Sequence, residues 1–287
     1  MRYEAPDNIK SAVAMLAKEK GLAFVLAGGT DLLVKMKAGM IEPDLVVDIK
    51  KIKGMADIKK SATGFRIGAA VPGVALSENA ALSKAWPGIV EGANLIGSKQ
   101  VQGRCTMIGN LCNGSPAADG VPALIAARAK VVVSGPKGKR TIAVEQVPVS
   151  PGRTCLKKGE IIEAILLPKR PPRSSDAYLR FIPRTEMDIA VVSAAVNLVL
   201  DPRGVVNDAR VALGAVAPTI LVVADAAKAL IGSKLDAAAL EKLAAACSAA
   251  CRPIDDKRGT IEFRTKVAGV LARRAAEIAY RRAGGKL

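Results

Sequence analysis

Two short stretches of the chain carry small polar residues at spacings that suit the binding of a phosphate group. The first is Gly28-Gly29-Thr30-Asp31, which ends one apolar run and precedes another. Glycines let a backbone approach a ligand closely, and successive free N–H groups that lead into a helix form an anion-binding nest. The stretch is neither the dinucleotide fingerprint G-x-G-x-x-G nor a P-loop. Alone, such a turn is more often a plain connection between a strand and a helix.

The second stretch is "KQVQGRCTMIGNLCNGSPAADGVP", residues 99–122, which is rich in glycine, asparagine and small polar residues. A long polar loop within a compact domain is usually functional or disordered, and the interleaved Met107, Ile108 and Leu111 argue against disorder. Two separate loops of small residues suggest one ligand held from both sides, and a cofactor that contains a pyrophosphate fits that requirement. Asp119 is a candidate cap for a helix that begins near Val121.

Hydrophobic periodicity predicts the elements that position these loops. A compact β-turn-α-β unit should place the glycine turn at its ligand end, and a mixed unit rich in strands should follow between residues 64 and 167. The stretch 167–177 is rich in Pro, Arg and Ser and is typical of a linker. Asp201-Pro202-Arg203-Gly204 predicts a hairpin, and the chain after Pro218 is expected to be helical. The expected helices are 8–20, 31–36, 117–127, 225–231, 236–250 and 255–283, and the expected strands include 23–27, 45–49, 130–135 and 160–168.

Composition limits the chemistry that the chain can perform. Lys and Arg exceed Asp and Glu by 43 to 26, which favours anionic partners, and histidine is absent. The commonest general base and metal ligand is therefore missing, and a cofactor is expected to carry any reaction. The five cysteines show no C-x-x-C spacing, so we expect reduced thiols in a cytoplasmic protein and no metal site.

The two loops also carry a resemblance to a known family. They resemble the A-G-G-T-D-L loop and the K-Q-V-R-x-x-x-T-I-G-G-N-L-x-x-x-S-P-x-x-D segment of the FAD-binding medium subunits of molybdenum hydroxylases, the carbon monoxide dehydrogenase and xanthine dehydrogenase family. The resemblance continues through "LKKGEIIEAILLP" at 156–168, "YLRFIPRTEMDIAVVSAAV" at 178–196 and "IEFRTKVAGVLARRA" at 261–275. It covers nearly the whole chain, in the family's order.

The resemblance implies an α+β protein with a two-subdomain FAD-binding fold of the PCMH type, followed by a C-terminal antiparallel sheet covered by helices. The implied domains are FAD-binding subdomain 1 at 1–55, subdomain 2 at 56–170 and the C-terminal α+β domain at 178–287. The chain would accept electrons onto FAD from the [2Fe–2S] clusters of a small subunit and pass them to an external acceptor. A large molybdopterin subunit would complete the heterotrimer, which is expected to form a dimer of heterotrimers.

The resemblance also implies roles for individual residues, none of them catalytic. The first loop would wrap the pyrophosphate, the second would contact the diphosphate and ribityl side, Ile96 would pack near the isoalloxazine and Ile162 beside the adenine half. The implied cofactor-binding residues are Leu26, Ala27, Gly28, Gly29, Thr30, Asp31, Leu32, Leu33, Ile96, Thr106, Met107, Ile108, Gly109, Asn110, Asp119, Ile162 and Arg180. The chain departs from the family at Ile108, where a glycine is usual, and at Arg180, where lysine is common.

Two other functions remain open at this point. A free-standing FAD oxidoreductase of the same fold would need substrate-binding groups that cannot be assigned, and a basic binding protein that has lost FAD is compatible with Ile108. The sequence indicates neither the organic substrate of the complex nor the electron acceptor. The basic cluster at the C-terminal end, which includes Arg273, Arg274 and Arg281, is either a solvated helix face or a docking surface for a more acidic subunit.

Overall fold

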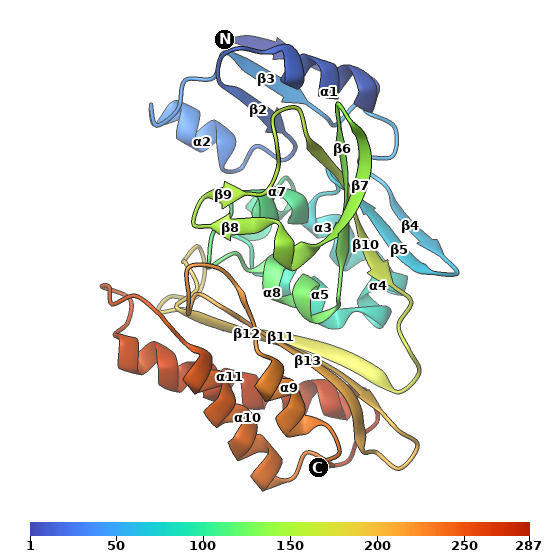
Figure 1. Cartoon of the computed structure of the whole chain (residues 1–287), viewed down its shortest axis with the longest axis vertical. Coiled ribbons are helices and arrows are strands. Elements are labelled where there is room, and N and C mark those ends of the chain that lie inside the picture. Colours follow the sequence, from blue (N-terminus) through green and yellow to red (C-terminus); the bar gives the residue numbers. More distant parts are fainter.

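The N-terminal part of the chain folds around a three-stranded parallel sheet in the order β1-β3-β2, at the top of Figure 1. The structure is a computed structural model and describes all residues, 1–287. The elements are β1 (Arg2–Glu4), α1 (Ile9–Lys18), β2 (Ala23–Leu26), α2 (Leu32–Lys37) and β3 (Leu45–Asp48). Asn8 caps α1 by accepting a hydrogen bond from the Ser11 N–H at 2.8 Å, and the helix buries Ala12, Val13 and Leu16. Strand β2 ends at Leu26, and its carboxyl end leads directly into the glycine turn.

The middle of the chain forms a five-stranded antiparallel sheet in the order β4-β5-β10-β6-β7. Its strands are β4 (Ile58–Ser61), β5 (Gly64–Gly68), β6 (Lys130–Gly135), β7 (Gly138–Ala143) and β10 (Ile161–Pro168). Six short helices lie between β5 and β6: α3 (Gly73–Glu78), α4 (Ala80–Ala85), α5 (Pro87–Asn94), α6 (Lys99–Gln102), α7 (Met107–Cys112) and α8 (Gly120–Ala126). The sequence predicted only α8, because helices this short present no repeated apolar stripe and depend on tertiary packing. The turn η1 (Val144–Gln146) and the small hairpin of β8 (Pro148–Ser150) and β9 (Arg153–Thr154) complete this part.

The C-terminal part is an antiparallel sheet in the order β11-β12-β13-β14, with helices on both faces. Its elements are β11 (Ser174–Phe181), β12 (Val192–Leu200), β13 (Val206–Gly214), β14 (Leu221–Val222), α9 (Ala224–Leu230), α10 (Ala237–Ala250) and α11 (Ile261–Arg282). In Figure 1, α9 and α11 contact the lower face of the sheet and α10 packs against these two helices, while α5 and α8 of the middle part contact the other face. Burial on both sides explains why nearly every residue of β12 is buried. The expected antiparallel sheet with covering helices is confirmed, as is the hairpin around Gly204.

Three sequence-based expectations were wrong at this level. The stretch 167–177 is not a linker, because its ends belong to β10 and β11 and only 169–173 connects them. Arg170 in this connection has a side chain that is only 11% exposed, stacks over the Trp86 ring at 3.7 Å and pairs with Asp176. The last helix begins at Ile261 rather than at residue 255, and the short strand β14 follows Pro218. Contacts with distant segments explain the first of these differences. The start of the last helix is set locally, because the Thr260 side chain caps it by accepting a hydrogen bond from the Phe263 N–H at 3.1 Å.

No helix of the chain combines the length and the apolar character that crossing a bilayer requires.

Candidate functional site

The two positions of the first loop, Gly28 and Gly29, require glycine for different structural reasons. Gly29 has φ of +77°, a conformation that a side chain strains, whereas Gly28 packs against the carbonyl of Arg104. A Cβ at Gly28 would lie 2.0 Å from the Arg104 oxygen, so only glycine allows the two loops to meet. The backbone N–H groups of residues 27–32 donate no hydrogen bond within the chain. The turn therefore offers a row of free donors at the end of β2.

The second stretch folds into α6, a short connection and α7. The Thr106 side chain caps α7 by accepting a hydrogen bond from the Gly109 N–H at 2.9 Å, and Asn110 Oδ1 accepts one from the Gly120 N–H at 3.0 Å. Ile108 is buried within α7 and has ordinary helical backbone, so the residue that replaces the family's usual glycine causes no strain there. These contacts hold the segment against the glycine turn.

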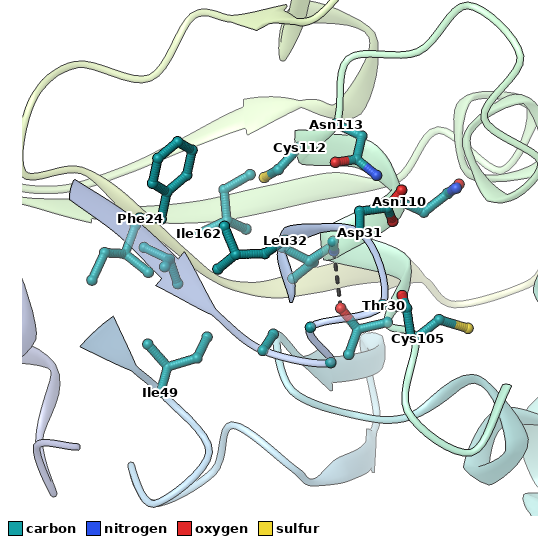
Figure 2. Close-up of a pocket in the computed structure, with 18 of the residues that line it drawn as sticks. Phe24, Thr30, Asp31, Leu32, Ile49, Cys105, Asn110, Cys112, Asn113 and Ile162 are labelled. Carbon is teal, nitrogen blue, oxygen red and sulfur yellow. Dashed lines mark hydrogen bonds between the residues drawn. The ribbon is translucent and has the colours of Figure 1, made fainter. Parts of the chain in front are cut away.

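A cavity of about 330 Å³ lies between the two loops, and residues from β2, α2, α7 and β10 line it. Figure 2 shows that its two ends differ in character. Phe24, Ile49 and Ile162 lie at one end, while Asn110, Asn113, Thr30 and Cys105 lie at the other. The cavity thus joins an apolar end to a polar end, with the free amides of the turn at its wall. That arrangement suits a long ligand with an aromatic group and a central anion.

The carboxylate of Glu160 lines the cavity but is neutralised by a neighbour. Arg140 donates to it through Nε at 3.0 Å and through Nη2 at 2.9 Å, and the Lys157 N–H donates at 2.7 Å. The Arg140 hydrogen bonds hold the pKa of Glu160 below its usual range. Burial raises the pKa of the lining thiols Cys105 and Cys112 to about 11 and about 12, so both are protonated at neutral pH. The cavity wall therefore offers binding groups and no reactive thiolate.

Asp119 forms a buried cluster with Tyr178 and Arg180 from β11. The Tyr178 hydroxyl donates to Asp119 Oδ1 at 3.0 Å, and Arg180 Nη1 donates to Oδ2 at 2.7 Å. Burial raises the pKa of Asp119 to about 6, although the Arg180 charge opposes the shift. The side chain makes no cap hydrogen bond to α8, so the alternative of a simple helix cap was wrong. Asp119 instead ties the middle of the chain to the C-terminal sheet.

The structure brings most of the predicted site residues together and leaves the others beside the cavity. Those that line it are Ala27, Gly28, Gly29, Thr30, Asp31, Leu32, Ile96, Thr106, Ile108, Gly109, Asn110 and Ile162. Leu26 and Met107 are buried behind the loops, Leu33 is exposed, and Asp119 and Arg180 pair with each other outside the lining.

Several lining residues were not predicted from the sequence: Phe24, Val25, Lys35, Ile41, Ile49, Cys105, Cys112, Asn113, Gly152, Leu156, Glu160 and Ile161. Phe24 is one of the few aromatic residues in the chain and lies in the strand that precedes the glycine turn. This position could have marked it as a candidate binding residue. Gly152 and Glu160 carried none, because their approach depends on how the segment from β8 to β10 folds back. The Gly152 N–H donates to the Gly114 carbonyl at 3.0 Å, which brings this region against the end of α7.

Family models and relatives match along nearly all of the chain. Residues 1–170 match the FAD binding domain in molybdopterin dehydrogenase, and residues 176–279 match the CO dehydrogenase flavoprotein C-terminal domain. The chain is 36% identical to the carbon monoxide dehydrogenase medium chain of Afipia carboxidovorans, over 98% of this chain and 97% of that one. It is 27% identical to the xanthine dehydrogenase FAD-binding subunit of Escherichia coli O157:H7, over 99% and 98%.

Solved structures agree with these matches. A chain of the Cu,Mo-CO dehydrogenase in its cyanide-inactivated form superimposes with a TM-score of 0.93 at 35% identity, with 98% of each chain covered. Quinoline 2-oxidoreductase from Pseudomonas putida 86 shares the fold, with a TM-score of 0.90 at 23% identity over 99% of this chain and 98% of that one. The expected fold class, the expected cofactor and the oxidoreductase assignment are thereby confirmed. The chain belongs to the family of FAD-binding subunits of molybdenum hydroxylases, of the carbon monoxide dehydrogenase and xanthine dehydrogenase type.

Proposed function

We propose that the cavity between the glycine turn and α7 is the FAD site of an electron-transfer subunit. The observation that carries the proposal is the row of free N–H groups at residues 27–32, which opens on a cavity with one apolar and one polar end. These donors suit the oxygens of a pyrophosphate, because backbone amides bind anions without bringing a side chain close.

The apolar end formed by Phe24, Ile49 and Ile162 would hold the adenine, and the polar end would face the ribityl chain and the flavin. Asn110 uses its amide oxygen on Gly120 and keeps its Nδ2 donor for a ligand. Arg180 Nε is buried without an acceptor, which supports its assignment as a contact of a group absent from the chain itself. Asp119 lies outside the cavity lining, and its assignment as a cofactor contact rests on the family resemblance.

The chain would act within a complex rather than alone. Bound FAD supplies the redox chemistry that connects one-electron clusters with an external acceptor. We place a small subunit with two [2Fe–2S] clusters as the electron donor and a large molybdopterin subunit as the site of substrate oxidation, in a cytoplasmic dimer of heterotrimers. The medium-chain relatives, named as subunits of carbon monoxide and xanthine dehydrogenases, support this placement.

The test is to purify the chain alone and together with its genomic neighbours, and to record visible spectra and metal content. Flavin bands in both samples, with iron and molybdenum in the co-purified complex, are the expected result. Flavin without metals in either preparation would instead favour a free-standing FAD oxidoreductase. Colourless protein in both would favour a basic binding protein that has lost FAD.

A pair of glycine variants tests the site itself. Gly29→Val should abolish FAD retention, since the added side chain meets Leu26 and Leu33 at 3.0 Å and distorts the turn. Gly39→Val is the matched control, because Gly39 also has positive φ, +67°, but nothing lies within 4 Å of its Cβ position and it is outside the cavity lining. Unchanged flavin content in Gly29→Val would refute the phosphate-loop assignment.

A further inference from the structure

Few charged side chains line the cavity, and only one of them has an ion-pair partner within the chain. The ionisable side chains that line it, apart from the thiols, are Asp31, Lys35 and Glu160. Glu160 is neutralised by its two hydrogen bonds from Arg140. Lys35 is the single cation of the lining. Neither Asp31 nor Lys35 forms an ion pair or a side-chain hydrogen bond within the chain, so Lys35 is free to bind an anion.

Helix α2 explains why Lys35 is unpaired. The helix buries none of its residues, so its side chains find no partner in the core of the protein. Lys35 lies one turn after Asp31 and joins Leu32 in the lining, whereas Lys37 of the same helix does not line the cavity. The fold therefore presents one of two neighbouring lysines to the ligand and leaves the other in solvent.

The ligand brings more negative charge than the backbone can balance. The pyrophosphate of a dinucleotide carries two negative charges, and amide donors satisfy its oxygens without adding a compensating charge. A lysine ammonium is the usual point charge for that purpose and reaches phosphates through a flexible stem. Asp31 is negatively charged, so it cannot balance the charge of the pyrophosphate and would repel it.

We infer that Lys35 is the electrostatic anchor of the FAD pyrophosphate and sets the affinity of this subunit for its cofactor. The inference rests on the proposed FAD site. Because salt screens the attraction between Lys35 and the pyrophosphate, the contribution of Lys35 to FAD binding should weaken as the salt concentration rises.

The test compares Lys35→Gln with Lys37→Gln in the apoprotein. FAD is titrated and followed by quenching of flavin fluorescence at about 50 mM and about 300 mM salt. Lys35→Gln should raise the Kd for FAD about three- to tenfold at low salt and by a smaller factor at high salt, because the ammonium is partly exposed. Lys37→Gln should change Kd by less than about twofold at either salt concentration. ADP, used as a competitor that retains the pyrophosphate, should lose affinity for Lys35→Gln by a similar factor.

An Asp31→Asn background separates a direct role from an indirect one. If Lys35 acts on the pyrophosphate itself, the Lys35→Gln effect persists in that background; if it merely neutralises Asp31, the effect disappears and the inference is wrong. Equal losses for Lys35→Gln and Lys37→Gln, or none for either, would also overturn it. A wild-type chain that binds no FAD at all is a different result and refutes the proposed function instead.

Discussion

The change of Gly28 to alanine tests whether the FAD site depends on the close meeting of its two loops. The added Cβ would lie 2.0 Å from the Arg104 oxygen and 2.7 Å from its carbon. An ordinary contact begins at 3.4 Å, so the loops must separate by about 1.4 Å. Backbone lies on both sides of this contact, and no side chain can rotate away to relieve it.

The size of the effect follows from that displacement. Overpacking of this kind costs about 1–3 kcal/mol, and each 1.4 kcal/mol changes an equilibrium constant about tenfold. If the loops separate, donors from the turn and from α7 no longer converge on one ligand. The Kd for FAD should then rise about 10- to 100-fold.

The assay is a fluorescence titration of apoprotein with FAD, accompanied by a thermal melt of each variant. Gly103→Ala is the matched control, since Gly103 lies in the same segment at φ of −66° and its nearest neighbour, the Gln100 oxygen, is 3.4 Å from the added Cβ. Gly29→Ala provides a second variant if Gly28→Ala does not fold. A cooperatively folded Gly28→Ala protein with the wild-type Kd would refute the reasoning that loop contact positions the site.

Three further changes give separate outcomes. Phe24→Ala removes the aromatic wall at the apolar end, so the Kd for FAD in the same titration should rise about 5- to 20-fold, whereas the exposed Phe181→Ala, outside the lining, should leave it unchanged. Burial raises the folded-state pKa of Asp119 to about 6, so its stabilising contribution is complete below its unfolded pKa of 3.8 and is lost as pH rises through 6. Asp119→Asn does not titrate, so the melting temperature of the wild type minus that of Asp119→Asn should fall as pH rises from about 4 to about 7.5. Arg170→Met leaves the buried Asp176 without its partner and should cost about 3–5 kcal/mol in denaturant unfolding near neutral pH.

Each of these outcomes has a result that contradicts it. Equal FAD affinity in Phe24→Ala and the wild type would show that the adenine does not bind at that end of the cavity. A melting difference for Asp119→Asn that does not change with pH would show that the carboxyl group does not titrate between its unfolded and folded pKa values. Unchanged unfolding in Arg170→Met would mean that the junction between β10 and β11 contributes no stability through this pair.

Local chemistry made much of the architecture predictable. The helix at α1 follows from a cap and a regular apolar stripe, and the hairpin between β12 and β13 follows from turn residues that end at Gly204 with φ of +83°. The strand β6 was predicted with its observed bounds, because a short β-branched run between turns has few alternatives. The short helices from α3 to α7 had no such local signal and form where the surrounding sheets leave apolar surface to cover.

The same division applies to the site. The two glycine-rich loops and the kind of ligand that they suit could be predicted from the sequence, because backbone freedom and the scarcity of side chains are local properties. The folded chain was needed to show that Gly28 must be glycine because Arg104 approaches it, and that Asp119 is held by Arg180 instead of capping a helix. The fold also selects which of two neighbouring lysines lines the cavity. These relations depend on distances between residues far apart in the chain, and no local preference specifies them.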